Sequence, residues 1–399
     1  MMSLALLVAP SCKKKGCTDP LANNYSEKAK KDNGSCDYSP TEYTGGDITV
    51  NTTFTNKNIK ICEDLNVTAG LTIPAGTTII MCAGTSINVS STGYIKALGT
   101  ADKPIIIKGE TETKGFWVGI AIKSNNPNNI FSFVTVKDAG TYWAWENANV
   151  FVSGSISMDH SIISNSNDVG MYIDNNGSIN NFSANTFSNN TTGLNLKATQ
   201  VSKLDGATVF NDNNINNYIY VRSGTIGTDQ TCKKLDTDLL IYELYIDAGL
   251  TINAGSRLRM EASGYGIKVN SSGFLNCTGT TTEQIFIGGK YSSAGYWSGI
   301  KIASNNPNNI FKYTTVQDGG SYWAYEYSNI YLNGGKLSID NTSVTLANSY
   351  GIYVKSNSQI STSGSVQTTT AGVEANNTIT GNGTGANANC TNGCTVFFE

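Results

Sequence analysis

The chain has 399 residues, a formal net charge of −3, a pI of 5.4 and only 14% charged residues. This balance excludes the basic surface with which nucleic-acid-binding proteins neutralise phosphates. The low charge content and the 41 glycines are typical of many short strands joined by tight turns, because glycine tolerates positive φ angles.

The first twelve residues contain a short apolar run that ends at a cysteine. Met2 to Pro10 precede Ser11 and Cys12, and this pattern resembles the end of a bacterial lipoprotein signal peptide. The resemblance implies that residues 1–12 are a signal-peptide and lipobox remnant, and that a lipid on Cys12 is the only membrane contact. A truncated ordinary signal peptide is the alternative. We therefore expect an exported protein, held at the outer membrane or cell surface as a lipoprotein, or else secreted.

Residues 13–47 are predicted to be a cysteine-containing spacer and linker. Residues 17–36 read CTDPLANNYSEKAKKDNGSC and resemble a short module of exported bacterial surface proteins. We interpret this segment as a spacer closed by a disulfide. A calcium role for Asp19, Asp32 or Asn33 is the alternative. Proline and glycine in residues 37–47 are typical of a linker.

From residue 48 onwards the chain contains a tandem duplication. Residues 115–150 read GFWVGIAIKSNNPNNIFSFVTVKDAGTYWAWENANV, and residues 295–330 read GYWSGIKIASNNPNNIFKYTTVQDGGSYWAYEYSNI. Of these 36 positions, 22 are identical at a constant offset of 180. The match extends in both directions, which predicts copy 1 over residues 48–223 and copy 2 over residues 224–399. A long internal repeat indicates a stacked, quasi-one-dimensional architecture.

Short β-branched runs recur in both copies and are separated by Gly, Asn or Asp. Similar segments return after one expected solenoid turn, at 23 residues from Gly170 to Gly193 and 21 residues from Gly351 to Gly372. Asparagine-rich corners, such as residues 185–190 and 211–217, lie between the runs. Stacked asparagine amides at such corners can hydrogen-bond along the solenoid axis. An array of β-sandwiches is the alternative, and the regular spacing favours the solenoid.

The shared motif Gly-x-Trp-x-Gly-Ile-x-Ile is followed by Asn-Asn-Ile-Phe and then by Thr-Val-x-Asp-x-Gly. This combination resembles repeats of right-handed parallel β-helices of the pectate-lyase-like superfamily and of bacterial surface proteins. The resemblance covers most of residues 48–399. It implies an all-β, right-handed parallel β-helix (solenoid), here built from a tandem duplication. It also raises the hypothesis of an enzyme that cleaves a polysaccharide.

Eight cysteines remain when Cys12 is set aside, an even number that suits disulfides in an exported protein. Two pairs are close in sequence, and a third pair is separated by about one solenoid turn, which would stack its members. The favoured pairs are Cys17–Cys36, Cys390–Cys394 and Cys62–Cys82. No cysteine or histidine set has zinc-ligand spacing, so we expect neither a metal nor a cofactor.

Cleavage of a polysaccharide by a glycosidase would need two carboxylates facing one bond. The acids within the shared motif are Asp138 with Glu146, and Asp318 with Glu326. No base recurs beside them, because the lysine before Asp138 is a glutamine in copy 2. We therefore predict no catalytic residues, and keep a polysaccharide lyase or glycoside hydrolase as the alternative function.

The aromatic residues favour binding. The run Tyr142-Trp143-Ala144-Trp145 returns as Tyr322-Trp323-Ala324-Tyr325 in a chain with only five tryptophans. Planar rings stack on sugar faces, while nearby carboxylates and amides bind hydroxyl groups. We predict a surface-anchored, non-enzymatic glycan-binding or adhesion protein whose partner is an extracellular polysaccharide or cell-surface glycan. The candidate ligand-binding residues are Tyr142, Trp143, Trp145, Asp138, Glu146, Tyr322, Trp323, Tyr325, Asp318 and Glu326.

The alternative for the same rings is that they pack over a neighbouring turn, which would leave a passive stalk. Trp117 and Trp297 directly precede strands of alternating apolar residues and are expected to be structural. In a continuous helix the offset of 180 residues predicts about eight turns, with both aromatic runs on one face and about 40 Å apart. One long polymer could then be held twice.

Overall fold

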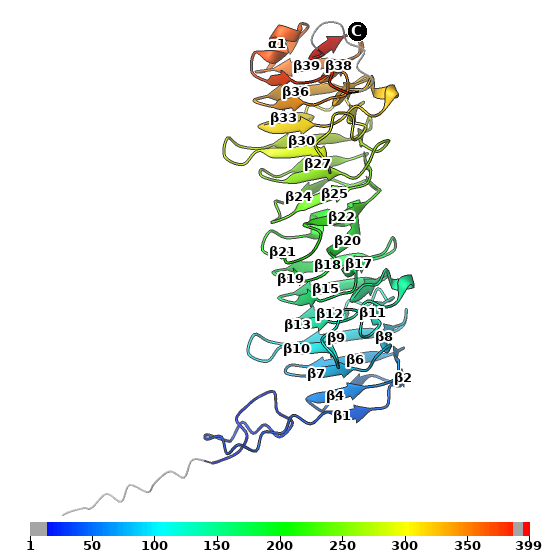
Figure 1. The fold of residues 1–399 in the computed structure, drawn as a ribbon, viewed down its shortest axis with the longest axis vertical. Helices are drawn as coiled ribbons and strands as arrows, with labels where there is room; N and C mark the ends of the chain where they lie inside the picture. Colours follow the sequence, from blue (N-terminus) through cyan, green and yellow to red (C-terminus); the bar gives the residue numbers. More distant parts are fainter. Residues whose placement is uncertain (1–13, 386–393) are drawn as a thin grey trace, which may run out of the picture.

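The computed structural model describes residues 14–385 and 394–399. From Thr41 onwards they form one elongated solenoid of stacked turns, in which the colour changes steadily from blue at one end to red at the other (Figure 1). Residues 14–40 lie beyond the blue end of this stack, outside its sheets. Paired strands are parallel, except for the antiparallel pair β39–β40 at the C-terminal end. The predicted all-β parallel β-helix built from a duplication is confirmed.

Five sheets form the walls of this solenoid. Sheet A contains β1 (Thr41–Tyr43), β4 (Asn58–Ile61), β7 (Thr78–Met81), β10 (Ile105–Gly109), β13 (Val134–Lys137), β16 (Ile162–Ser164), β19 (Thr186–Ser188) and β21 (Val209–Asp212). Sheet B contains β2 (Gly46–Ile48), β5 (Leu65–Val67), β8 (Ser86–Val89), β11 (Gly119–Ile122), β14 (Val150–Val152), β17 (Val169–Ile173), β20 (Thr192–Lys197), β22 (Tyr218–Arg222), β25 (Asp238–Ile241), β28 (Arg257–Met260), β31 (Ile285–Gly289), β34 (Thr314–Gln317), β37 (Ser343–Thr345) and β41 (Thr378–Thr380).

The other three sheets are shorter. Sheet C contains β3 (Thr52–Thr53), β6 (Gly70–Pro74), β9 (Tyr94–Leu98), β12 (Ile130–Ser132), β15 (Ser155–Asp159) and β18 (Ser178–Ser183). Sheet D contains β23 (Gly224–Ile226), β26 (Leu244–Ile246), β29 (Ile267–Val269), β32 (Ile300–Ile302), β35 (Ile330–Leu332), β38 (Ile352–Val354) and β42 (Val396–Phe398). Sheet E contains β24 (Gln230–Cys232), β27 (Gly249–Ile252), β30 (Phe274–Thr278), β33 (Ile310–Lys312), β36 (Lys336–Asp340), β39 (Gln359–Thr362) and β40 (Ser365–Gln367). The helical segments are η1 (Trp143–Trp145), η2 (Ala198–Lys203), η3 (Trp323–Tyr325) and α1 (Thr370–Glu374).

The two copies use these sheets differently. In copy 1 the chain passes through sheets A, B and C in each turn, whereas in copy 2 it passes through B, D and E. Strand β10 of sheet A is therefore repeated as β31 of sheet B, and β11 of sheet B is repeated as β32 of sheet D. Sheet B alone runs through both copies. Copy 2 is thus rotated about the solenoid axis by one sheet relative to copy 1.

This rotation originates at the junction between the copies. After β20, the helix η2 follows in place of a further strand of sheet C, and it packs against β18. Strand β22 then pairs with β20 of copy 1 on one side and with β25 of copy 2 on the other. The offset of 180 residues spans seven turns, from β11 to β31, plus one sheet, from β31 to β32. The offset is thus slightly more than seven turns and not the predicted eight or so, because the turns average more residues than the spacing suggested.

Only one of the two glycine spacings corresponds to a solenoid turn. Gly170 and Gly193 lie on the paired strands β17 and β20, as expected. Gly372 instead lies in α1, a short helix that the sequence pattern did not indicate. Its N-cap is Thr369, whose side chain accepts a hydrogen bond from the Gly372 amide.

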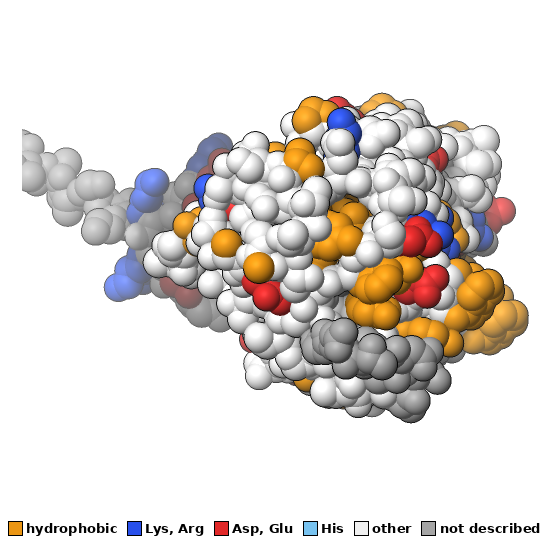
Figure 2. Space-filling model, turned by 90° about the horizontal axis from the view of Figure 1, so that it is seen from above, with side chains coloured by type: hydrophobic (Ala, Val, Ile, Leu, Met, Phe, Trp, Pro, Cys, Tyr) orange, Lys and Arg blue, Asp and Glu red, His pale blue; other side chains and the backbone are white. Residues whose placement is uncertain are grey.

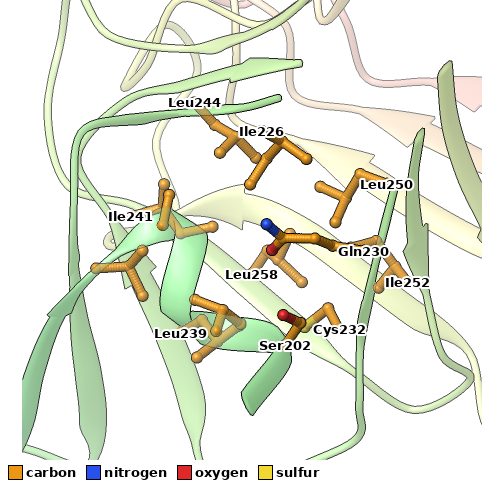
Figure 3. A pocket seen from close by; sticks show the side chains of 13 residues that line it. Ser202, Ile226, Gln230, Cys232, Leu239, Ile241, Leu244, Leu250, Ile252 and Leu258 are labelled. Atoms are coloured by element: carbon orange, nitrogen blue, oxygen red, sulfur yellow. The ribbon is translucent and has the colours of Figure 1, made fainter. Parts of the chain in front are cut away.

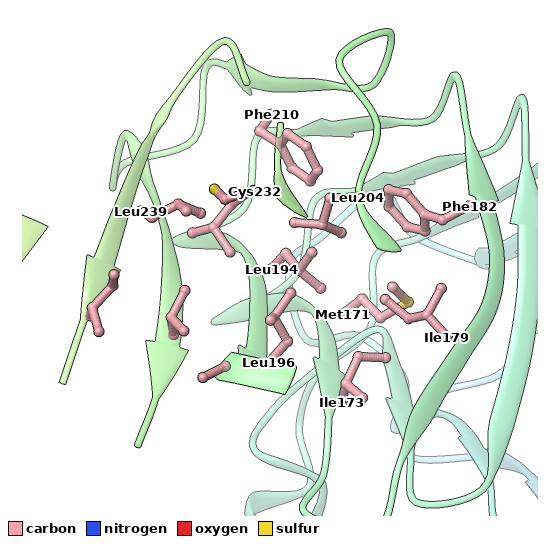
Figure 4. Close-up of a cluster of buried hydrophobic side chains, with 14 of the residues drawn as sticks. Met171, Ile173, Ile179, Phe182, Leu194, Leu196, Leu204, Phe210, Cys232 and Leu239 are labelled. Atoms are coloured by element: carbon pink, nitrogen blue, oxygen red, sulfur yellow. The ribbon is translucent and has the colours of Figure 1, made fainter. Parts of the chain in front are cut away.

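The solenoid interior is filled by the aliphatic side chains that alternate inwards along each strand. Trp117 and Trp297 are fully buried in this core. Their indole N–H groups donate to the carbonyl oxygens of Lys137 at 2.8 Å and Gln317 at 2.7 Å. The predicted structural role of both tryptophans is confirmed. Figure 4 shows the core around the junction, where aliphatic and phenylalanine side chains of copy 1 lie next to Cys232 and Leu239 of copy 2.

Buried asparagines line the corners of the solenoid and hydrogen-bond along its axis, as predicted. The Asn190 Nδ2 donates to the Asn214 Oδ1 at 3.1 Å and to the Ile163 carbonyl at 3.1 Å. The Asn214 Nδ2 donates in turn to the carbonyls of Phe187 and Phe210. These amides satisfy corner carbonyls that the strand ladders leave unpaired.

Two of the predicted disulfides are present, Cys17–Cys36 and Cys62–Cys82. Cys12 and Cys390 lie outside the described residues, so lipidation and the Cys390–Cys394 pair stay predictions. Cys232 and Cys277 are free, buried thiols, and burial raises the pKa of the Cys232 thiol to about 12. Two disulfides indicate an oxidising environment. Within residues 14–385 and 394–399, no helix has the length and apolar character needed to cross a membrane.

Candidate functional site

The predicted aromatic runs form the tips of two equivalent turns, which we name turn 1 (residues 138–149) and turn 2 (residues 318–329). In turn 1 the Trp143 side chain is 77% exposed, whereas Trp145 is only 9% exposed. In turn 2 Trp323 is 68% exposed and Tyr325 is 4% exposed. Each turn therefore presents one tryptophan to solvent and buries the second ring of its pair.

The tyrosine that begins each run supports the exposed ring. The Tyr142 ring lies 6.2 Å from the Trp143 ring and 5.4 Å from the Trp145 ring, between their centroids. The corresponding distances from Tyr322 to the next two rings of turn 2 are 5.9 Å and 5.1 Å. Tyr142 and Tyr322 are themselves partly exposed. The candidate surface of each turn therefore consists of an exposed tryptophan beside a tyrosine.

A buried asparagine closes the base of each turn. The Asn149 Oδ1 accepts a hydrogen bond from the Ala139 amide at 2.8 Å, and its Nδ2 donates to the Ser164 carbonyl at 2.6 Å. The Asn329 Oδ1 likewise accepts from the Gly319 amide at 2.7 Å. The two ends of each turn are thus tied together and to the solenoid wall. This attachment holds the exposed tryptophan on a rigid support.

The buried ring of turn 2 packs on the outer face of the neighbouring sheet. In copy 2 the Tyr325 ring stacks on Tyr331 of β35 at 5.6 Å, and Tyr331 contacts Tyr353 of β38 at 5.8 Å. Burial raises the pKa of the Tyr325 hydroxyl to about 12. In copy 1 Phe151 and Tyr172 form the equivalent stack on sheet B at 5.9 Å. The packing interpretation is therefore correct for the second ring of each run, but not for the exposed tryptophan.

Sequence reasoning missed this aromatic layer. Its signal was present, because Tyr331 and Tyr172 are the central residues of the short apolar runs Ile330-Tyr331-Leu332 and Met171-Tyr172-Ile173. Alternation in a strand places such a central ring on the outer face when its neighbours point inwards.

The structure does not bring the predicted acid pairs together at an open site. Asp138 is completely buried, and its carboxylate accepts a hydrogen bond from the Asn165 side chain at 2.7 Å. Burial raises the pKa of Asp138 and that of Asp318. Glu146 is exposed, and Glu326 is half-buried. Because one acid of each pair is inside the wall, the pair cannot present two carboxylates to one solvent-accessible glycosidic bond.

The rotation of copy 2 determines where the two turns lie. Turn 1 enters sheet B, between β13 and β14, whereas turn 2 leaves sheet B, between β34 and β35. The prediction that the two aromatic runs occupy equivalent rung positions is wrong, although both turns border sheet B. They flank opposite edges of the same sheet, separated by the seven steps from β14 to β34, or about 34 Å along the axis.

The views of the molecule agree with this placement. In Figure 1 two short coils, teal and yellow, project on the same side of the solenoid. Seen from the C-terminal end, hydrophobic side chains gather and protrude on that side (Figure 2). Both aromatic turns therefore lie on the same side of the molecule, although turn 1 precedes its strand of sheet B and turn 2 follows its strand.

The core itself offers no ligand site at the junction. A cavity of about 20 Å³ lies there, between apolar side chains that include Ile226, Leu239 and Leu250 (Figure 3). A space of this size holds at most about one water molecule, and an apolar lining gives that water few partners. Ligand binding is therefore confined to the outer surface in this region.

Comparison of the chain with protein-family models, with curated proteins and with solved structures finds no match. The class of protein is therefore defined by the fold and the site together. It is an all-β parallel solenoid that carries two exposed tryptophans on rigid turns.

Proposed function

We propose that this protein is a non-enzymatic glycan-binding or adhesion module. The observation that carries the proposal is the exposure of Trp143 and Trp323 on turns whose bases are tied to the solenoid by Asn149 and Asn329. An exposed tryptophan keeps a large apolar ring in water, and stacking that ring on a sugar face removes it from water. Both copies expose this tryptophan, although the ring two residues later, Trp145 or Tyr325, is buried.

The setting of these turns supports the same function. We propose that the solenoid belongs to the right-handed β-helices that resemble the pectate-lyase-like superfamily, and that it acts outside the cell. The two disulfides agree with export. In this proposal a lipid on Cys12 holds the chain at the outer membrane or cell surface, and the long solenoid carries the tryptophans away from it. The acid pairs of the turns give no support to a lyase or hydrolase.

The test is binding of the full chain to an array of polysaccharides, compared with Trp143→Ala, Trp323→Ala and the double variant. Removal of a ring that stacks on the ligand is expected to weaken binding by about tenfold or more. The free energy of unfolding should change by less than about 0.5 kcal/mol, because both rings lie on the surface. Affinity is measured by biolayer interferometry, and stability by urea unfolding.

Tyr38→Ala is the matched control, since Tyr38 is an exposed aromatic residue outside the two turns. It should bind like the unaltered chain. Wild-type affinity of the double variant for every retained glycan would contradict the proposal and favour a passive stalk.

A further inference from the structure

The chain contains only three arginines, and all of them lie on one surface. Arg222 is in β22, and Arg257 and Arg259 are in β28, so that all three belong to sheet B. The residues that alternate with them, such as Val221 and Leu258, belong to the core. The arginines therefore project from the outer face of sheet B, on strands that lie between turn 1 and turn 2.

The outward-facing aromatic residues of sheet B also lie on the strands between turn 1 and turn 2. Strands before β14 carry Asn66, Asn88 and Ala121 at the outward positions, and strands after β31 carry Thr315 and Gln317. Between them, from β14 to β31, the outward positions include five aromatic rings. These are Phe151, Tyr172, Tyr218, Tyr220 and Phe286. The interval bounded by the two exposed tryptophans is thus the aromatic part of sheet B.

Arg257 and Arg259 form a cationic pair over one of these rings. Their guanidinium carbons lie 4.8 Å and 4.2 Å from the centre of the Phe286 ring. The Nε atoms of both arginines donate to the two oxygens of Asp238, at 2.8 Å and 2.9 Å. Two positive charges therefore share one carboxylate, which leaves one charge without compensation within this group.

The donors of this pair are available to a ligand. The Arg257 side chain is 47% exposed and that of Arg259 is 23% exposed. The hydrogen bonds of Arg257 to other described residues use only Nε. Arg259 uses Nε and one terminal nitrogen, which donates to the Gly289 carbonyl. A planar guanidinium with free terminal N–H groups is suited to bidentate binding of a carboxylate or sulfate.

The other charged groups of this face are largely occupied. Arg222 stacks on Tyr172 at 4.4 Å and donates to Asn195 and to the Ile173 carbonyl. The carboxylates of Glu146 and Asp174 lie near enough to Arg222 to stabilise its charge. The Lys197 ammonium donates to the Asn175 carbonyl, and Lys290 pairs with Glu261 at 3.4 Å. The Asp318 carboxylate lies near enough to Arg259 to interact with its charge. Within the pair, the less compensated and more exposed charge is therefore that of Arg257.

We propose, building on the proposed glycan-binding function, that the outer face of sheet B is a binding track for an acidic polysaccharide. Sugar rings stack on Trp143 and Trp323 at the two ends of the track. Carboxylate or sulfate groups of the polymer bind Arg257 and Arg259 between them. Because copy 2 is rotated by one sheet, the polymer crosses sheet B obliquely, from the edge where its strands begin to the edge where they end. Contacts at both ends raise the affinity for long chains.

The experiment compares glycans that differ in charge alone. The full chain is tested against neutral dextran, carboxymethyl-dextran and dextran sulfate, and against an array of neutral and acidic polysaccharides. We expect the acidic members to be retained more tightly than their neutral counterparts, with binding that weakens as salt rises. The carboxymethyl and sulfate arms show which anionic group is preferred. Equal retention of neutral and acidic glycans would contradict the proposal of an acidic-polysaccharide track on sheet B.

The decisive variant is Arg257→Gln/Arg259→Gln, which should weaken binding of acidic glycans by about tenfold or more. Lys96→Gln/Lys108→Gln is the matched control, because it removes the same charge from sheets C and A. It should leave affinity unchanged. If the tryptophan variants lose binding and the arginine variant does not, the track is wrong and the proposed function stands. If neither set loses binding, both are wrong.

Asp238→Asn provides a second test that does not depend on the stability of the arginine variant. It removes the shared negative charge with little change of shape. Affinity for the acidic glycan should then rise at least about twofold, since both guanidinium groups become free to bind the ligand. Unchanged or lower affinity of a folded Asp238→Asn protein, as judged by circular dichroism, would contradict the inference.

Discussion

Replacing Trp297 by alanine is expected to destabilise the solenoid by about 4 kcal/mol. The side chain is fully buried, so its removal leaves a cavity in a wall whose strands are fixed by their neighbours on both sides. The Gln317 carbonyl also loses the indole donor that now lies 2.7 Å away. Urea unfolding, followed by far-UV circular dichroism, measures the change. Trp117→Ala should have a similar effect in copy 1.

Trp323→Ala is the control for this prediction, because it makes the same substitution in the same copy at a ring that is 68% exposed. Its unfolding free energy should stay within about 0.5 kcal/mol of the unaltered chain. Equal destabilisation by Trp297→Ala and Trp323→Ala would show that the exposed ring is part of the packing. The binding role of the turns would then lose its main support.

Asn214→Ala is expected to lower the free energy of unfolding by about 3 kcal/mol. The Asn214 amide accepts from the backbone and side chain of Asn190, and it donates to the carbonyls of Phe187 and Phe210. Alanine leaves these buried groups without partners, at the junction where the two copies meet. Asn217, three residues after Asn214 in the same corner, offers an exposed position for comparison.

Asn217→Ala should be nearly neutral, since its side chain faces solvent. Hydrogen exchange of the amides in β19 to β22 would show where the weakening lies. A loss below about 1 kcal/mol for Asn214→Ala would mean that water replaces the missing amide, and that the asparagine corners contribute little to stability.

Much of the fold could be predicted from the sequence, because a solenoid repeats its chemistry at every turn. The spacing of similar strands indicated the parallel β-helix, and the separation of Cys62 and Cys82 indicated their disulfide. The rotation of copy 2 could not be predicted. A sequence repeat shows that two segments have the same environment, but it does not show how many residues the intervening turns contain. Here η2 replaces a strand of sheet C, and β22 pairs with β20 of copy 1 and with β25 of copy 2 within sheet B.

The candidate site could also be predicted only in part from the sequence. The repeated run identified the aromatic turns, but its pattern could not separate the exposed Trp143 from the buried Trp145. That difference depends on the single turn of 3-10 helix over residues 143–145, which turns the second ring towards the wall. The arginine pair was missed because Arg257 and Arg259 lie outside the repeated motif. Their relation to the tryptophans exists only once the strands of sheet B are stacked.

The most direct test of the account is acrylamide quenching of tryptophan fluorescence, with and without the tightest-binding acidic polysaccharide of the array. Trp143 and Trp323 are open to the quencher, whereas Trp117, Trp145 and Trp297 are buried. If sugar rings stack on the two exposed tryptophans, saturating polysaccharide should remove most of the accessible quenching, and Trp143→Ala/Trp323→Ala should show little quenching in either state. Unchanged quenching of the unaltered chain at saturation would contradict the central claim, because the ligand would then bind away from both rings.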